Sequence, residues 1–258
     1  MTSALLLWPM NPANERSDAS VRHVTPRRKG GSVATVRGVQ VVDPLEAALL
    51  AGAGRVASRR PVLPPSGPRS PASERLLLVA LSLFASQGFH GTSVRDLARE
   101  LGIQPASVYS HVPSKEHLLA QLVELGHRTH ATHVEQAVAE AGGDAAARLA
   151  AFMRAHVSVH ARWSMLAVVS NNELASLPTA LAQPSLLLRQ RTSRLLRGIV
   201  EQGRDDGTFD VPDVLLVVAA LAAIGMRVAA WYDGDTEHDV EQVAEVYAVL
   251  GLRLVGRP

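Results

Sequence analysis

Two histidines at helical spacing are the first candidates for chemistry in this sequence. The segment Asp144–His160 predicts a helix. One face carries, at i, i+3, i+4, i+7 and i+11, Leu149, Phe152, Met153, His156 and His160. An imidazole on such a face can bind a ligand or a metal ion, or transfer a proton. A zinc protease needs Glu directly after the first histidine, and Val157 stands there instead. We therefore favour pocket-lining or structural histidines over a metal site or a catalytic pair.

The preceding helix, predicted from Lys115 to about Ala141, supplies a second wall for such a pocket. Its apolar stripe Leu118, Leu122 and Leu125 continues on the same face as Thr129, Thr132, His133 and Gln136. A face that turns polar while pointing inward indicates a lined cavity; a stripe that has reached solvent has the same pattern. His127, His130 and His133 step by three and miss the i, i+4 pairing of a metal clamp. The predicted ligand-binding residues, two of them from a further helix predicted at Arg162–Leu177, are Thr129, His133, Phe152, His156, His160, Trp163 and Asn172.

A second group of polar residues lies on a short helix predicted from Gln104 to about His111. On either side of Val108 and Tyr109, this helix carries Gln104, Ala106, Ser107, Ser110 and His111. Small polar side chains let a helix approach the major groove of DNA, and Gln, Ser and His can reach base edges or phosphates. The next helix begins near Ser114, which can cap it. Its first amides and the Lys115 ammonium would form a phosphate site.

The elements that position these residues predict a helix-turn-helix. Its first helix runs from Ser93 or Val94 to Leu101, with Ser93 as N-cap, and Gly102 ends it in the left-handed conformation. Pro105 suits the first turn of the second helix. Ser73–Gln87, with Ser73 as its cap, predicts the third helix of the domain. We expect Phe89, Ile103 and Val112 to face the small core between them.

This pattern resembles the DNA-binding region of the TetR family of one-component bacterial transcriptional regulators. The shared order is Gly-Phe-x-x-Thr-Ser-x-x-Asp-Leu-Ala, then Gly-Ile, then Val-Tyr-x-His-Val-x-Ser-Lys-x-x-Leu-Leu, within about Ser73–Leu122. Val112 stands where the family usually has Phe and keeps an apolar plug. The resemblance implies DNA contacts from Thr92, Ser93, Arg95, Gln104, Ala106, Ser107, Tyr109, Ser110, His111 and Lys115. By the same resemblance, Tyr109 would lie on the sugar-phosphate backbone and Lys115 would contact a phosphate.

Composition and charge narrow the class of protein. The 258 residues contain no cysteine, which excludes disulfides, thiolate metal sites and cysteine nucleophiles. The net charge of +2 is unevenly divided, because residues 1–70 hold ten Arg or Lys against four Asp or Glu. We predict a disordered basic extension over 1–70 with one short helix at Asp43–Val56, a DNA-binding domain over 71–122, and a ligand-binding and dimerisation domain over 123–258. Ala4–Trp8 is too short for a signal core, so we expect a cytoplasmic protein.

The last two predicted helices could form an interface between copies of the chain. Asp213–Tyr232 is apolar all round, but its uninterrupted apolar run of thirteen residues is too short to cross a bilayer. The final helix, about Val240–Leu254, repeats apolar residues three and four apart. These two helices would make a homodimer if they paired with the same helices of a second copy. In the alternative, both helices complete the core of a monomer. Before them, we expect a loop bracketed by Pro178 and Pro184 and a helix over Ser185–Gly203.

These observations predict an all-α protein of about nine helices that acts as a ligand-responsive DNA-binding regulator and not as an enzyme. A repressor released from its operator DNA by a small molecule is the expected function, with no cofactor. From His156 to Gly234 the chain resembles the ligand domain of TetR-type regulators of fatty-acid and sterol breakdown, which implies an acyl-CoA thioester as effector. The alternative is a helical enzyme or binding protein that uses a cavity at His156 and His160.

Overall fold

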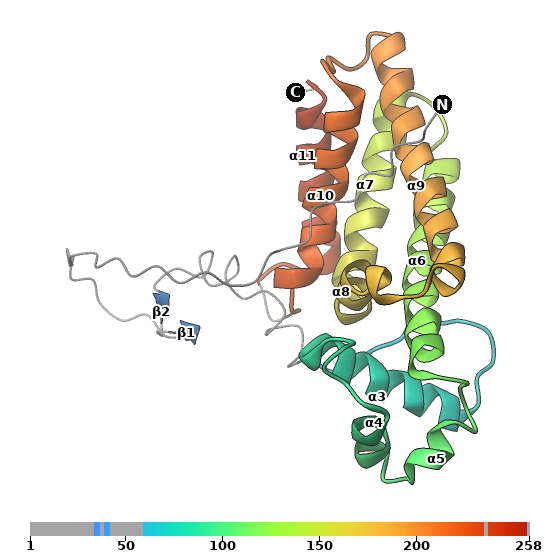
Figure 1. Ribbon diagram of the computed structural model, residues 1–258. Helices are drawn as coiled ribbons and strands as arrows, with labels where there is room; N and C mark the ends of the chain where they lie inside the picture. Colours follow the sequence, from blue (N-terminus) through green and yellow to red (C-terminus); the bar gives the residue numbers. More distant parts are fainter. Residues whose placement is uncertain (1–33, 37–38, 42–58, 235–236, 257–258) are drawn as a thin grey trace, which may run out of the picture.

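The computed structural model describes residues 34–36, 39–41, 59–234 and 237–256, and in these residues the protein is almost entirely helical (Figure 1). The α-helices are α3 (Pro71–Gln87), α4 (Val94–Leu101), α5 (Pro105–Val108), α6 (Lys115–Ala141), α7 (Ala145–Arg162), α8 (Ser164–Asn172), α9 (Thr179–Asp205), α10 (Val214–Trp231) and α11 (Val240–Leu254). A 3-10 turn, η1 (Leu174–Ser176), follows α8, and two three-residue strands, β1 (Ala34–Val36) and β2 (Val39–Val41), pair antiparallel. The predicted all-α class with about nine helices is confirmed. The helix predicted at Asp43–Val56 lies outside the described residues.

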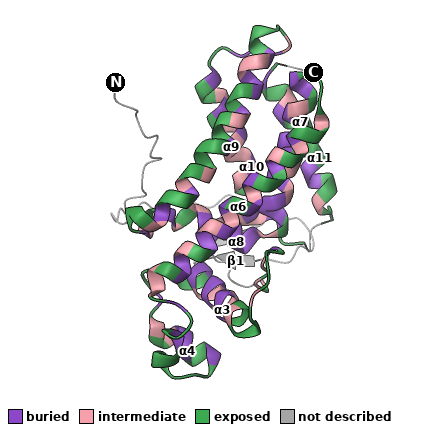
Figure 2. Cartoon of the chain, turned by 90° about the vertical axis from the view of Figure 1, so that its right-hand side faces the viewer, coloured by how far each residue is buried: buried purple, intermediate pink, exposed green. Residues whose placement is uncertain are grey.

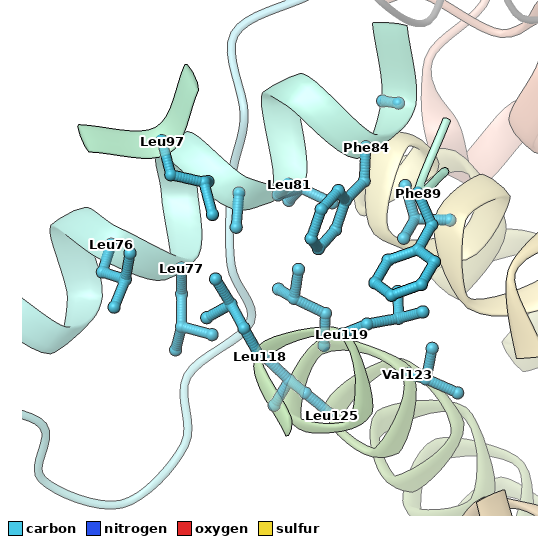
Figure 3. Packing of buried hydrophobic residues seen from close by; sticks show 14 of the residues in the cluster. Leu76, Leu77, Leu81, Phe84, Phe89, Leu97, Leu118, Leu119, Val123 and Leu125 are labelled. Carbon is cyan, nitrogen blue, oxygen red and sulfur yellow. The ribbon is translucent and has the colours of Figure 1, made fainter. Parts of the chain in front are cut away.

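The helices form two regions, here called the head and the body. The head contains α3, α4, α5 and the first turns of α6, and the body contains the rest of α6 with α7 to α11 (Figure 1). The head is held by buried leucine and phenylalanine side chains from three helices. Figure 3 shows Leu81 and Phe84 of α3 facing Leu118 and Leu119 of α6, with Phe89 beside them. Burying each such side chain contributes about 1.5–3 kcal/mol.

Local signals set the helix boundaries in the head. Ser93 caps α4 by accepting from the Asp96 amide, and the Asp96 carboxylate accepts from the Ser93 amide, so a capping box is present. Gly102 ends α4 with φ +69°, as predicted. The cap predicted for α3 was wrong, because Ser70 and not Ser73 caps the helix. The Ser70 hydroxyl accepts from the Ser73 amide, and Pro71 occupies the first turn.

The predicted core of the head needs one correction. Phe89 and Val112 are buried as expected, and the two rings of Phe84 and Phe89 meet edge to face. Ile103, expected to face inward, is 38% exposed. It follows Gly102, whose left-handed conformation ends α4 and turns the chain outward.

The body is a bundle in which α6 and α9 are 27 residues long. Its helices turn buried faces to one another and exposed faces outward (Figure 2). The predicted loop between Pro178 and Pro184 is a helix, since α9 begins at Thr179 and continues through Pro184. Proline at this place removes one helical hydrogen bond. The burial of Ala182 and Ser185 holds the turn in place.

α10 is an 18-residue helix that is long and apolar enough, by length and composition, to cross a membrane. The expectation that this segment is too short to do so, based on its apolar run of thirteen residues, was wrong. Only 28% of it is buried.

Residues 59–70, predicted to belong to a disordered extension, lie against the helices. Pro64 is buried, Leu63 packs against the head core, and Arg59 donates to the Ser164 hydroxyl over 2.6 Å.

Candidate functional site: a helix-turn-helix surface and a histidine-lined cavity

The outer surface of the head presents polar side chains over a packed interior. α5 is shorter than predicted, since its helix ends at Val108, and Tyr109–His111 form a turn in which the Ser110 hydroxyl donates to the Ser107 carbonyl. Val108 is buried and anchors this segment, whereas Tyr109 is 54% exposed. Of the ten residues predicted to contact DNA, the exposed ones are Ser93, Arg95, Gln104, Ala106, Ser107, Tyr109, Ser110 and His111. They form a surface that a duplex could reach.

The other two predicted DNA contacts, Thr92 and Lys115, are bonded within the head. The buried Thr92 hydroxyl donates to the Gly88 carbonyl over 2.9 Å. The Lys115 ammonium donates to the carbonyls of Phe89 (2.8 Å) and Thr92 (2.7 Å), and lies 4.0 Å from the centre of the Phe89 ring. Both side chains therefore tie the loop before α4 to the neighbouring helices, and their predicted DNA contacts stay predictions.

A cavity of about 180 Å³ lies in the body among α6, α7, α8, α9 and α10. Its residues are Gly126, His127, His130, Phe152, His156, Val159, His160, Ala167, Ser170, Asn171, Arg189, Thr192, Ser193, Leu196, Val218, Ala222 and Met226. Four of these are histidines, and none is acidic. The cavity therefore combines apolar side chains, imidazoles and the Arg189 guanidinium, and no carboxylate lines it.

The cavity brings together three of the seven residues predicted to bind a ligand, and their role stays a prediction. Phe152, His156 and His160 line the cavity, as the stripe on α7 indicated. Thr129, His133, Trp163 and Asn172 do not. His133 is exposed and its ring lies 5.3 Å from that of Trp163, because the stripe of α6 followed from Leu118 reaches solvent at Thr132 and His133.

His127, His130, Asn171 and Arg189 line the cavity, and sequence reasoning missed them. A signal for two of them was present, because α6 carries a second stripe, which consists of Leu119, Val123, His127, His130 and Val134. A helix packed on two sides buries two stripes, and the histidines of α6 lie on the second one. For Asn171 and Arg189, no local pattern separates cavity-facing from solvent-facing polar residues.

Backbone carbonyls and burial fix the state of the cavity histidines. His127, His156 and His160 each donate one ring N–H to a carbonyl oxygen, of Val123 (2.8 Å), Ala222 (3.1 Å) and His156 (2.7 Å) respectively. Desolvation is the main cause that lowers the pKa of His156 to about 3, and that of His127 and of His160 to about 4. Desolvation and the neighbouring imidazoles also lower the pKa of His130 well below 6.5. All four are neutral imidazoles at pH 7.

A close helix contact fixes the ring of His156. A Cβ atom on Gly225 of α10 would lie 2.0 Å from Cδ2 of His156, which no packing allows. Glycine at 225 is what lets the imidazole lie against the α10 backbone and donate to Ala222.

The head and the body are connected near the cavity. α6 begins in the head and carries Gly126, His127 and His130 to the cavity wall. α8 carries Ala167, Ser170 and Asn171, and directly after it the Glu173 carboxylate accepts from the Phe89 amide over 3.1 Å. Two separate elements thus join the cavity to the loop that precedes α4.

Comparisons with known proteins agree with this architecture of a helix-turn-helix head on a cavity-bearing helical body. Residues 76–122 match the family of bacterial regulatory proteins, tetR family, and residues 142–255 match the family of tetracyclin repressor-like C-terminal domains. The HTH-type transcriptional repressor KstR2 of Rhodococcus jostii is 27% identical over 201 residues, 76% of this chain and 98% of that protein.

Two solved structures have the same fold. A regulatory protein of the tetR family from Rhodococcus RHA1 is 30% identical, with a TM-score of 0.65 over 74% of this chain and 100% of that chain. AibR, solved with isovaleryl coenzyme A and operator DNA, has a TM-score of 0.61 at 21% identity, over 69% of this chain and 96% of that chain. Fold and head define a helix-turn-helix DNA-binding regulator of transcription. The chain belongs to the TetR family.

Proposed function

We propose that this protein is a repressor that binds operator DNA as a homodimer and leaves it when a small molecule enters the body cavity. The observation that carries the proposal is the exposed polar surface of Gln104, Ser107 and Tyr109 above the buried anchor Val108. Exposed polar groups on a short helix with a fully packed underside suit insertion into the major groove. We also propose a cytoplasmic location, where such a protein meets DNA.

An apolar face on the last two helices supports the homodimer. Leu215 and Leu216 of α10 and, on α11, Val246, Leu250 and Leu254 are each at least 42% exposed. A second copy would cover this face with the same face of its own, in an isologous contact. Sedimentation of the full chain should give a dimer, and charged substitutions such as Leu250→Glu should give monomers.

An acyl-CoA thioester is the effector that we propose for the cavity. The resemblance to regulators of fatty-acid and sterol breakdown favours it, and AibR, of the same fold, was solved with isovaleryl coenzyme A. A cavity of about 180 Å³ can hold a short acyl group and not the whole thioester, since sites for drug-sized ligands measure about 300–1,000 Å³. The nucleotide part would therefore lie outside. Thermal shifts with acyl-CoAs of increasing chain length, against the free acids, test this; no stabilisation by any thioester contradicts it.

The effector would act by population shift. α6 and the α8–Glu173 connection each touch both the cavity and the loop that holds α4. A ligand that prefers one arrangement of these helices changes the separation of the two reading heads, which the operator sets at about 34–36 Å. Glu173→Gln weakens the carboxylate contact to the Phe89 amide, and we expect operator binding to persist while its response to the effector declines.

Selection of bound sequences from a random DNA pool tests the proposal in one experiment. We expect a palindrome whose half-sites are one helical turn apart, with affinity that falls steeply as salt rises. Recovery of unselected sequences at low salt would contradict operator recognition. Recovery of a single half-site would contradict the dimer and leave DNA reading intact.

An enzyme acting at His156 and His160 is the other class that the sequence left open. No acidic side chain lines the cavity among the described residues, so neither histidine has a carboxylate to orient it there as a general base. The members of the matched family are in general regulators. We therefore propose a binding function for the cavity.

A further inference from the structure

Three imidazoles from two helices converge in the body cavity. The ligand nitrogens of His130 on α6 and of His156 and His160 on α7 all lie within 4.8 Å of one another. The ring centres are 4.9 Å apart for His130 and His156, 5.4 Å for His130 and His160, and 4.5 Å for His156 and His160. His156 and His160 are one helical turn apart, the spacing at which two histidines of a helix can bind one metal ion.

The carbonyl hydrogen bonds of His156 and His160 leave one ring nitrogen of each without a proton. The Nε2–H of His156 donates to Ala222, so its Nδ1 carries the lone pair and accepts the Nε2–H of His130 over 2.7 Å. A metal ion would replace this hydrogen bond, and the proton of His130 would move to Nδ1. The Nδ1–H of His160 donates to the His156 carbonyl, so its Nε2 carries the lone pair, which accepts from Asn171 Nδ2 over 3.4 Å. Metal-binding histidines almost always donate their other ring N–H to a carbonyl or a carboxylate, because this bond orients the ring. Two of the three rings have this arrangement.

A fourth imidazole beside the cluster has a buried nitrogen without a partner. His127 is 7% exposed, its Nδ1–H donates to Val123, and its Nε2 is buried with no hydrogen-bond partner. An unsatisfied buried acceptor costs about 1–3 kcal/mol. This nitrogen is therefore a free acceptor among the residues that line the cavity.

We propose that His130, His156 and His160 bind one divalent transition-metal ion, with zinc the best-fitting ion, and leave a fourth position open toward the cavity. Three neutral imidazoles without a carboxylate or a thiolate suit Zn²⁺, Cu²⁺ or Ni²⁺ and not Mg²⁺ or Ca²⁺. A tetrahedral Zn²⁺ with Zn–N bonds of about 2.0–2.1 Å places its nitrogens roughly 3.3 Å apart. The present 2.7 Å between His130 and His156 would open, and the other pairs, which are at most 4.8 Å apart, would adjust mainly through rotation of the half-buried His130.

The absence of acidic residues from the cavity also determines the role of the ion. No described carboxylate is placed to act as a base on a metal-bound water, so the ion would serve structure or ligand binding and not hydrolysis. It would join α6 to α7, the first of which continues into the head. This inference does not rest on the proposed operator or effector.

Cobalt binding by the full chain tests the site. After treatment with a chelator, the protein is titrated with Co²⁺, which has intense visible bands when four-coordinate, and Zn²⁺ is then added in competition. We expect one Co²⁺ per chain with a tetrahedral spectrum that Zn²⁺ abolishes. His130→Gln and His160→Gln should each weaken binding roughly 100-fold or more, since even outer-shell changes cost 10–100-fold. The matched control is His133→Gln, an exposed histidine one turn from His130 that lies outside the cavity.

The outcomes separate this site from adventitious binding by the other histidines of the chain. Loss of binding in the two cavity variants and its retention in His133→Gln supports the site. Equal binding in all four proteins, a six-coordinate spectrum, or no binding to the wild type overturns it. X-ray absorption of the zinc-loaded wild type needs no variant that could misfold: imidazole nitrogens at about 2.0–2.1 Å support the site, and oxygen-only coordination overturns it.

Discussion

The head and the body hold their polar side chains in opposite ways. In the head, Gln104, Ser107 and Tyr109 stand in solvent above a closed core, whereas in the body His156 and His160 are buried around a cavity. The head can be rigid because its ligand, a duplex, lies outside it. The body must leave space inside, which means that some helix faces are not closely packed. The comparison teaches that the proposed contact with DNA needs an exposed surface over a closely packed core, whereas the proposed contact with a small molecule needs space inside the core.

The largest expected effect comes from opening the closed core of the head. Leu81 is 0% exposed and belongs to a cluster that also contains Leu166 and Val169 of α8. Leu81→Ala should lower the free energy of unfolding by about 2–5 kcal/mol, because a cavity replaces the lost side chain. Urea denaturation followed by circular dichroism measures this. Since the cluster joins head and body, we expect one transition; two separate transitions would contradict a shared core.

The next effect comes from adding a methyl group at the close contact between α10 and the His156 ring. Gly225→Ala places a methyl group 2.0 Å from the His156 ring and should destabilise the protein by about 1–3 kcal/mol through overpacking. The control is Gly198→Ala on α9, where an added Cβ meets nothing within 4 Å. This control should stabilise by up to about 1 kcal/mol, because alanine favours a helix. Thermal melts of both variants check the difference, and equal melting temperatures would contradict a tightly held His156.

A smaller effect is expected on the exposed surface of the head. Tyr109→Ala removes a ring that is 54% exposed, so it should weaken operator binding roughly tenfold, or about 1.4 kcal/mol, and leave the melting temperature unchanged. Gel retardation and a thermal melt of the same preparation measure the two effects. As control, Leu187→Ala changes an apolar residue of α9 that is 51% exposed and lies outside both the DNA-binding surface and the proposed dimer face. Unchanged operator affinity in Tyr109→Ala would count against the proposed docking surface.

The smallest effect concerns a helix cap. Ser93→Ala removes the acceptor for the Asp96 amide and should cost about 0.5–2 kcal/mol of stability. The control is Ser73→Ala, which leaves the α3 cap in place because Ser70 accepts the hydrogen bond there. Urea midpoints of the two variants separate them. A loss in Ser73→Ala as large as that in Ser93→Ala would contradict the observed cap.

Much of the head could be predicted from sequence because local interactions specify it. Ser93 and Ser114 as caps, Gly102 as stop and Val108 among exposed neighbours each act within a few residues of the chain. The errors there occur at helix boundaries. The cap of α3 and the end of α5 differ from the prediction by a few residues, and Ile103, directly after the end of α4, is exposed and not buried. The bonds of Lys115 to the Phe89 and Thr92 carbonyls span more than twenty residues and had no local sign.

In the body, sequence by itself determined the helices and the His156–His160 stripe, because helical period and apolar pattern are properties of one segment. Only the tertiary structure decided that α6 brings His130 and His127 to that stripe and turns His133 to solvent. Both stripes of α6 begin with apolar residues and then carry histidine, and the helices packed against each stripe determine which becomes the cavity wall. The cavity depends on the relative placement of five helices, and no single segment of the chain encodes it.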